Sequence, residues 1–113
     1  MTREQLLPPE VSAALPPLGA TEGMSELVAE VKFFYPDFGW TWYGIEFDGE
    51  DMFFGLVDGD VPELGYFRLS ELLENRGKLG CAIERDLYFE PTPVYQLTGE
   101  QESGGDEPVA LIS

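Results

Sequence analysis

The stretch "WTWYGIEFDGEDMFFGLVDGDVPELGYFRL", residues 40–69, decides the fold. It contains three runs rich in aromatic and β-branched residues, which strands favour, at 40–47, 52–57 and 64–69. Polar segments separate these runs, and the Asp-Gly steps at 48–49 and 58–59 are typical of hairpin turns. Parallel strands would need connections of about a dozen residues or more. The pattern therefore predicts an antiparallel meander.

The flanking sequence extends this meander on both sides. Upstream, "ELVAEVKFF", residues 26–34, predicts another strand, closed by a turn at Pro36-Asp37. Downstream, "SELLENRG" predicts a short helix with Ser70 as its N-cap and Gly77 as its end. The segment "CAIERDLYFEPTPV" adds one or two strands that end at Pro91. The predicted fold is α+β: a small antiparallel β-meander of about four to six strands with one or two short helices.

The length of 113 residues suits a single domain. Residues 1–24 hold two Pro-Pro pairs, which interrupt helices. We expect a Pro-rich N-terminal arm there, opening with a helical turn near residues 3–7 and packing on the domain. Residues 25–95 are the predicted α+β core domain, and the acidic residues 96–113 are a predicted flexible tail. The leucines expected to pack the arm are Leu6, Leu7, Leu15 and Leu18.

The charge balance excludes several partners. The chain has 22 acidic and 6 basic residues, a formal net charge of -16. Because Lys and Arg build affinity for phosphate backbones, direct binding to nucleic acid is disfavoured, and anionic membranes are repelled as well. A basic protein partner is favoured, and its approach would be steered by charge and weakened by salt.

Missing residue types exclude several chemistries and sites. The chain has no His, which removes Ser-His-Asp and Cys-His catalysis and imidazole zinc sites. Its single cysteine, Cys81, cannot form an intramolecular disulfide, and we interpret it as a small buried core residue. No apolar run approaches the roughly 18 residues that span a bilayer, and the N-terminus lacks a signal-peptide core. We therefore expect a cytoplasmic protein.

The candidate partner-binding surface is an acidic rim. Residues 39–67 contain no Lys, Arg or His. In a regular strand Glu46, Asp48 and Glu50 would project to one side at a spacing of roughly 6.6–6.8 Å, comparable with successive phosphates along a nucleic-acid strand. We place the two Asp-Gly turns at neighbouring hairpin ends and expect Trp40 to be an exposed apolar anchor. The predicted site comprises Trp40, Glu46, Asp48, Glu50, Asp51, Asp58, Asp60 and Glu63.

Other interpretations of these carboxylates stay open. They are also consistent with solvated turns, in a structural or accessory subunit whose acidity only confers solubility. A small metal-dependent or acid-base enzyme is a further alternative, with carboxylates as calcium or magnesium ligands, or as a glycosidase pair beside Trp40 and Trp42. The spacing does not match a calcium loop, however, and so small a domain leaves little room for a cleft. We predict no catalytic residues, no metal site and no cofactor.

The order of aromatic, Gly and Pro residues resembles a known family. The run "KFFYPDFGWTWYGIEFDGEDMFFGLVDGDVPELGYFRLSEL", followed by "RGKLG" and "ERDLYFEPTPV", is similar to the small bacterial proteins called domain of unknown function twenty-nine fifty-eight. The segment "LPPLGATEG" resembles the N-terminal signature of that family, with Gly19 where a Tyr is expected. The resemblance covers about residues 15–95.

The resemblance implies a genomic context and no site residues. Members of this family are carried by plasmids, phages and integrative elements, often beside anti-defence genes, and the resemblance transfers no activity, cofactor or binding residue to this chain. Together with the charge, it leads us to expect a non-enzymatic acidic interaction protein of a bacterial mobile element. Its rim would mimic nucleic acid and engage the basic groove of a DNA- or RNA-binding defence protein.

Overall fold

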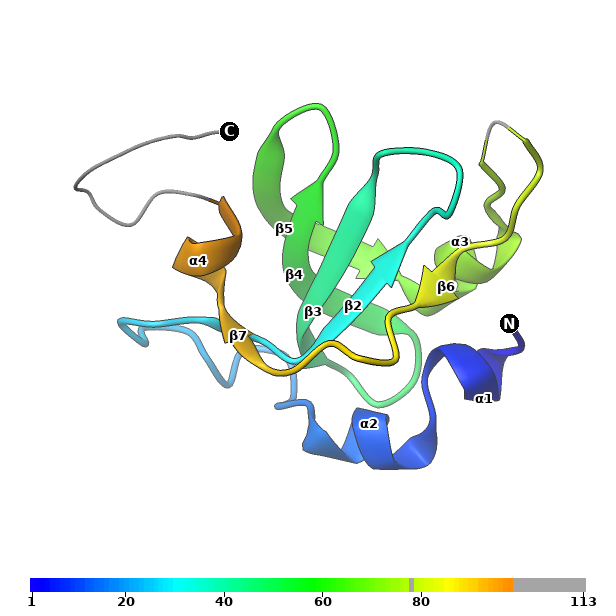
Figure 1. Cartoon of the computed structure of the whole chain (residues 1–113). Coiled ribbons are helices and arrows are strands. Elements are labelled where there is room, and N and C mark those ends of the chain that lie inside the picture. The colour runs from blue at the N-terminus through cyan, green and yellow to red at the C-terminus, as the bar shows by residue number, and fades with distance from the viewer. Residues whose placement is uncertain (78, 99–113) are drawn as a thin grey trace.

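A computed structural model describes residues 1–77 and 79–98 (Figure 1). Its main sheet is antiparallel, with strand order β5-β4-β3-β2-β6, and a second small sheet pairs β1 with β7. The strands are β1 (Val28–Ala29), β2 (Val31–Phe34), β3 (Thr41–Phe47), β4 (Met52–Asp58), β5 (Pro62–Arg68), β6 (Glu84–Arg85) and β7 (Thr92–Pro93). The helices are α1 (Arg3–Leu6), α2 (Pro9–Ala14), α3 (Leu69–Glu74) and α4 (Val94–Thr98). The predicted α+β class and antiparallel meander are confirmed.

The central hairpins form as the alternating runs predict, whereas the upstream stretch differs. Residues 26–34 do not make one strand: they divide between β1 and β2, which belong to different sheets. Between them, the Glu30 amide donates to the Gly44 carbonyl at 2.8 Å. Downstream, the chain continues past Pro91 into β7, which pairs with β1.

A bulge in β3 changes which side chains share a face. The pairing with β4 shifts between Gly44 and Glu46, so Ile45 has no partner in the ladder. A β-bulge of this kind inserts one extra residue and reverses the alternation beyond it. Phe47 therefore joins the same core cluster as Trp42. Glu46 pairs with Phe54 and lies on the opposite face.

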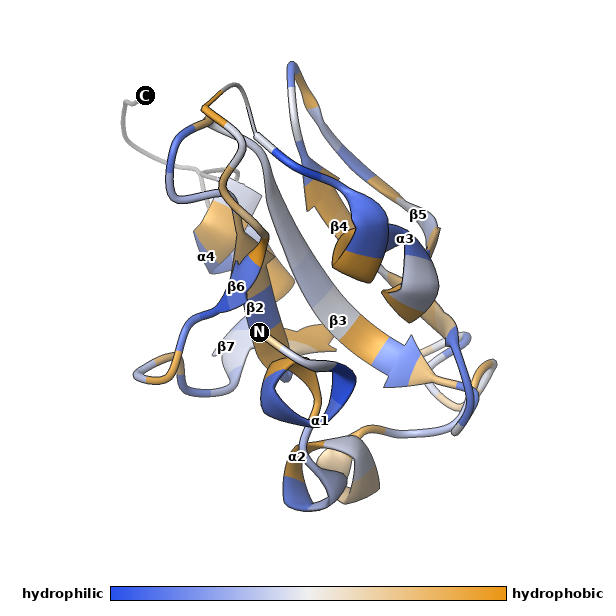
Figure 2. Cartoon of the chain, turned by 90° about the vertical axis from the view of Figure 1, so that its right-hand side faces the viewer, coloured by the Kyte–Doolittle hydropathy of each residue, from blue (hydrophilic) through white to orange (hydrophobic). Residues whose placement is uncertain are grey.

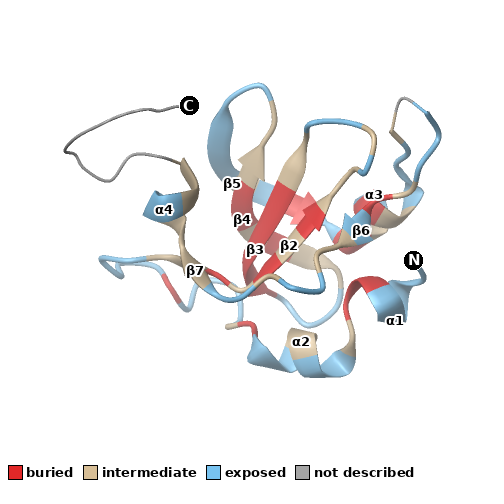
Figure 3. Cartoon of the chain, in the orientation of Figure 1, coloured by how far each residue is buried: buried red, intermediate tan, exposed pale blue. Residues whose placement is uncertain are grey.

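Each face of the main sheet packs against a separate core. The larger core holds residues of β2 to β5 together with leucines from the arm and from α3, and Figure 2 shows α1 and α3 on that side of the sheet. On the opposite face, Tyr43 and Leu56 pack with Ala29 beneath Phe89 and Val94. Figure 3 shows that burial is concentrated in β2, β3 and β4. The large core contains Leu6, Leu7, Leu15, Val31, Phe33, Trp42, Phe47, Phe53, Phe67, Leu69, Leu72 and Ile83.

The arm packs its first three leucines as expected, but Leu18 is 38% exposed. The arm also forms a second helix, because Pro9 occupies the first turn of α2, where a missing amide proton costs nothing. The interpretation of Cys81 as buried is wrong, since this residue is exposed. Within the described ranges, no helix is long and apolar enough to cross a membrane. Most of the predicted tail, residues 99–113, lies outside the described residues.

The predicted start of α3 is also corrected. Its N-cap position is Arg68, and Ser70 lies inside the helix. The capping group comes from the β3–β4 turn: the Asp51 carboxylate accepts hydrogen bonds from the Ser70 amide at 2.9 Å and its hydroxyl at 2.7 Å. The helix ends at Glu74, before the predicted stop at Gly77.

Candidate functional site

The predicted acidic residues lie at two opposite ends of the main sheet. In the ladder Phe47 pairs with Phe53 beside the first turn, whereas Asp58 pairs with Thr41 at the far end of the same hairpin. Consecutive turns of a meander alternate between sheet ends, and Figure 1 shows the β4–β5 turn beside the β2–β3 connection, away from the β3–β4 turn. The prediction of one continuous rim is therefore wrong.

Glu46 is an internal residue of the fold. Its side chain is buried, with 4% relative exposure. It accepts hydrogen bonds from the Gly19 amide at 2.7 Å, from the Thr21 amide at 2.8 Å and from the Thr21 hydroxyl. Burial alone raises the pKa of Glu46, but the Thr21 and Gly19 donors outweigh it and hold the pKa below its ordinary value. This carboxylate ties the arm to β3 and is not part of an exposed rim, because the bulge turns it toward the arm.

Asp48 organises the β3–β4 turn. Its Oδ1 accepts the amides of Glu50 at 2.8 Å, Asp51 at 2.8 Å and Met52 at 3.0 Å. These backbone donors, the Asp51 amide first, lower the pKa of Asp48. Gly49 next to it has a φ of 89°, a conformation that suits glycine. The carboxylate is exposed but its charge is already solvated by the turn.

Two arginines lie close to the Asp51 carboxylate at the β3–β4 end of the sheet. The Asp51 carboxylate lies 3.5 Å from Arg3 Nη1 and 3.9 Å from Arg68 Nη1. Burial raises the pKa of Asp51. Its hydrogen bonds with Ser70 and Arg3 lower the pKa by a larger amount, so the pKa lies below its ordinary value. Arg3 also donates to the Glu50 carbonyl. Asp48 and Asp51 thus hold the fold together. Of the predicted acidic residues in this turn, Glu50 is the one whose side chain is exposed without a hydrogen bond or ion pair to another described residue.

The opposite end of the sheet brings Trp40 together with the other predicted acids. Trp40 is half-buried rather than exposed and packs against the edge of the large core. Its ring covers Gly59 so closely that a Cβ there would lie 2.6 Å from the ring carbons. A hollow of about 300 Å³ adjoins this contact. It is lined by Trp40, Val57, Gly59, Asp60, Val61 and Glu63.

The carboxylates of this end are not neutralised. Asp60 and Glu63 are exposed and line this hollow, whereas Asp58, in the same turn, is half-buried and does not line it. Across residues 1–77 and 79–98, the structure gives these three carboxylates no hydrogen bond and no ion pair. Val61, between them, is 58% exposed. We call Trp40, Asp58, Asp60, Val61 and Glu63 the turn-end patch.

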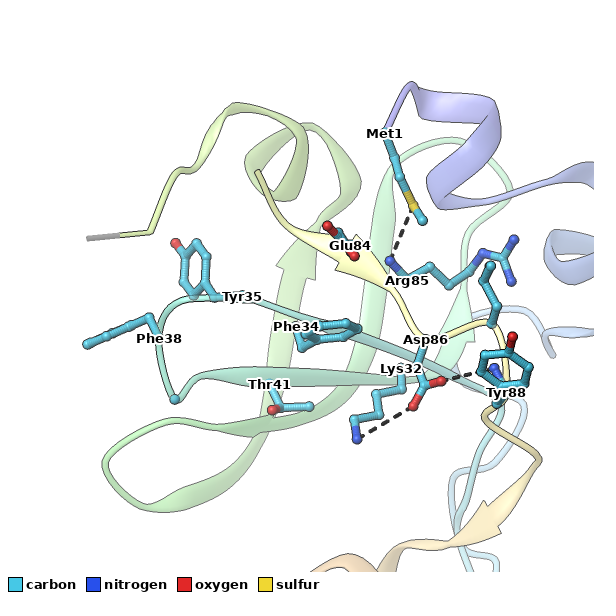
Figure 4. A pocket seen from close by; sticks show the side chains of 12 residues that line it. Met1, Lys32, Phe34, Tyr35, Phe38, Thr41, Glu84, Arg85, Asp86 and Tyr88 are labelled. Carbon is cyan, nitrogen blue, oxygen red and sulfur yellow. Dashed lines mark hydrogen bonds and ion pairs between the residues drawn. The ribbon is translucent and has the colours of Figure 1, made fainter. Parts of the chain in front are cut away.

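A larger cavity, which the sequence did not indicate, lies beside β2 and β6 (Figure 4). Its volume is about 470 Å³, and it is lined by Phe34, Thr41, Tyr88 and two cations. Lys32 Nζ lies 3.7 Å from the Asp86 carboxylate and 5.9 Å from the centre of the Tyr43 ring. Arg85 Nε donates to the Gln5 carbonyl at 3.2 Å. Lys32 and Arg85 therefore already have partners. In the sequence, the only feature that could have indicated this cavity was the position of these two cations among aromatic residues.

Two observations concern the metal-site and sugar-platform hypotheses. In the described part of the chain, no group of three or more His, Cys, Asp or Glu side chains could hold a metal ion. The hypothesis that Trp40 and Trp42 form a sugar platform is wrong for Trp42, which is 7% exposed and belongs to the core.

A comparison with protein families is decisive for classification. Residues 6–98 match the family described as "Protein of unknown function (DUF2958)". The chain belongs to this family. The match begins in α1 and ends with α4, so the DUF2958 unit includes the arm as well as the sheet. No curated protein and no solved structure matches the chain significantly.

Proposed function

We propose that this DUF2958 protein is a non-enzymatic acidic interaction protein that binds a basic protein partner through the turn-end patch. The partner is a nucleic-acid-binding protein, and the bound acidic protein competes with nucleic acid for its basic groove. A defence protein countered by a mobile element is the biological setting that the family resemblance suggests.

The observation that carries the proposal is the difference between the two ends of the sheet. At the β3–β4 end, carboxylates are satisfied by backbone amides, Ser70 and two arginines. At the β4–β5 end, Asp58, Asp60 and Glu63 have no such partners among the described residues. Like charges held together without compensation cost folding free energy, and a cationic partner that binds them would relieve this repulsion.

Trp40 and Val61 add apolar contact to this charge. Aromatic anchors surrounded by polar residues contribute much of the energy of protein interfaces. The Trp40 ring is held in place by Gly59 and by Trp42, whose ring centre is 6.0 Å away. A partner would therefore meet a rigid ring inside a negative field, which favours fast, salt-dependent association.

The test uses three baits on nuclease-treated bacterial lysate. The first is the native chain, and the second carries Asp58→Asn, Asp60→Asn and Glu63→Gln. The third carries Glu10→Gln, Glu74→Gln and Glu90→Gln, which change the charge equally at exposed sites elsewhere. We expect the native and third baits to retain the same nucleic-acid-binding protein, released by salt and by competing DNA, and the second bait to lose it.

Two results would contradict the proposal. Equal retention by the second bait would remove the turn-end patch as the binding surface. Capture that neither salt nor DNA reverses would show that electrostatic competition with nucleic acid is not the mechanism.

A further inference from the structure

The strand β5 is a long edge of the main sheet. The strand order places it at one side, paired only with β4 through Pro62–Arg68. An edge strand presents a row of unpaired amide and carbonyl groups. The other edge is short, because β6 has two residues and α1 packs beside it. In the described structure, β5 is therefore the long edge that can accept another strand.

The middle of β5 lacks the features that usually protect an edge. Proteins shield such strands with charges, prolines or bulges. Here Pro62, Glu63 and Arg68 lie at its two ends, and the centre reads Leu64-Gly65-Tyr66. Leu64 is 50% and Tyr66 67% exposed, although both are large apolar side chains.

A groove accompanies this edge on the face that carries Glu46. Leu64 and Tyr66 pair with Leu56 and Phe54, so all four side chains lie on that face. Two hollows, of about 270 and 320 Å³, flank them and share Leu27. The Tyr66 ring forms one wall, 5.3 Å from the centre of the Phe54 ring.

The negative charge of the groove favours a basic partner segment. Its lining includes Glu22, Glu26 and the buried Glu46, and it contains no Lys or Arg. A second copy of the chain paired at this edge would place a second molecule of net charge -16 directly against the first. That repulsion disfavours self-pairing. A segment with basic residues is attracted instead.

We propose that β5 binds an extended partner segment of alternating basic and apolar residues, which adds to the sheet as a further strand. The apolar side chains of that segment pack on Leu64 and Tyr66 over the groove. Because side chains alternate along a strand, its basic side chains lie on the other face of the sheet, the face that carries Glu63 of the turn-end patch. This inference rests on the proposed function, because it states how the basic partner is held.

Strand addition to β5 would select among basic partners, which attraction between charges alone does not do. In strand addition, main-chain hydrogen bonds provide affinity and alternate side chains provide selection. The turn-end patch continues into β5 through Pro62, which lines the second hollow beside Leu64. One extended segment can therefore contact both surfaces.

The test uses a labelled synthetic peptide as long as β5, with alternating lysine and valine. Binding is measured by fluorescence anisotropy, and its position by amide shifts of ¹⁵N-labelled full-length protein. We expect binding with shifts at residues 63–68, since Pro62 has no amide proton. A peptide with glutamate in place of lysine should not bind. Alternate N-methylation of the backbone amides, which blocks strand pairing, should weaken binding about tenfold or more.

Protein variants separate the groove from general acidity. Leu64→Ser with Tyr66→Ser should weaken peptide binding about tenfold. The matched control is Leu87→Ser with Tyr88→Ser, which removes the same side chains where they are 61% and 92% exposed, away from β5. That control should bind as the native chain does.

Several outcomes would overturn the inference. One is the absence of binding by the lysine-valine peptide, and another is equal binding of the N-methylated peptide. The latter, with shifts only at the turn-end patch, would leave the proposed function standing and remove strand addition. A dimer in sedimentation that is lost with Leu64→Ser and Tyr66→Ser would assign the edge to a second copy instead.

Discussion

At the level of single residues, Glu46 differs most from its predicted role. A regular strand would place it in line with Asp48 and Glu50, and nothing in the local sequence reveals the bulge that turns it toward the arm. Its partners, Gly19 and Thr21, are more than twenty residues away in the chain. Contacts of this kind arise from tertiary packing, which periodicity does not describe.

We predict that Glu46→Gln destabilises the protein. An amide group would face the Gly19 or Thr21 amide with a donor of its own, so at least one buried charge-assisted hydrogen bond is lost. Such bonds contribute roughly 1.5–3 kcal/mol, and we expect the free energy of unfolding to fall by about that amount. Urea titration measures it, with Glu10→Gln as the exposed control. A fall no larger than in that control would contradict the assigned role.

The same residue predicts a pH dependence. Because the pKa of Glu46 is lower in the folded state, its stabilising contribution is complete above the unfolded value of about 4.3. That contribution is lost as the pH falls through the folded pKa. The difference in unfolding free energy between the native chain and Glu46→Gln should therefore be largest near neutral pH and shrink in acid. A constant difference across that range would show that Glu46 does not titrate as inferred.

Gly59 is predicted to control the position of Trp40. In Gly59→Ala the new Cβ would lie 2.6 Å from the indole, so the ring must move. Overpacking of this kind costs about 1–3 kcal/mol, and tryptophan emission should shift to longer wavelength as Trp40 becomes more exposed. The control is Gly65→Ala, where no heavy atom lies within 4 Å of the added Cβ. Unchanged stability and emission in Gly59→Ala would refute the contact.

At the level of elements, local signals predicted β3, β4 and β5 because alternation and Asp-Gly turns act within a few residues. They failed where an element depends on distant partners. Residues 26–34 divide because β1 pairs with β7, about sixty residues downstream. The start of α3 was misplaced because its cap is Asp51, from a turn nineteen residues earlier.

We predict that Asp51→Ala loosens the start of α3. Both hydrogen bonds to Ser70 and the ion pair with Arg3 disappear. Loss of an N-terminal cap costs about 0.5–2 kcal/mol. Amide exchange in residues 69–74 should accelerate. Ser70→Ala removes only the hydroxyl bond and should have a smaller effect. Equal protection of α3 in Asp51→Ala would show that Asp51 is not its cap.

At the level of the whole molecule, the candidate site was half predictable. The sequence identified the segment without cations and the residues Trp40, Asp58, Asp60 and Glu63, which the fold does bring to one end. It did not assign the two turns to opposite ends, although a meander requires it. Which carboxylates form ion pairs within the fold depends on where Arg3 and Arg68 lie. Their positions follow only from the tertiary structure.

The two ends of the sheet are therefore predicted to respond to charge removal with opposite signs. Asp51→Ala should lower the melting temperature, whereas Asp58→Asn, Asp60→Asn and Glu63→Gln together should raise it by roughly 2–4 °C at low ionic strength, because they relieve uncompensated repulsion. Salt screens exposed charges over about 10 Å at 0.1 M, so the gain should shrink as salt is added. The triple change Glu10→Gln, Glu74→Gln and Glu90→Gln should raise it less, since those acids are dispersed. Scanning calorimetry across salt concentrations measures both effects. If the triple turn-end variant were no more stable than this control, the carboxylates of the turn-end patch would not repel one another strongly. The electrostatic reason for a basic partner to bind the patch would then be lost.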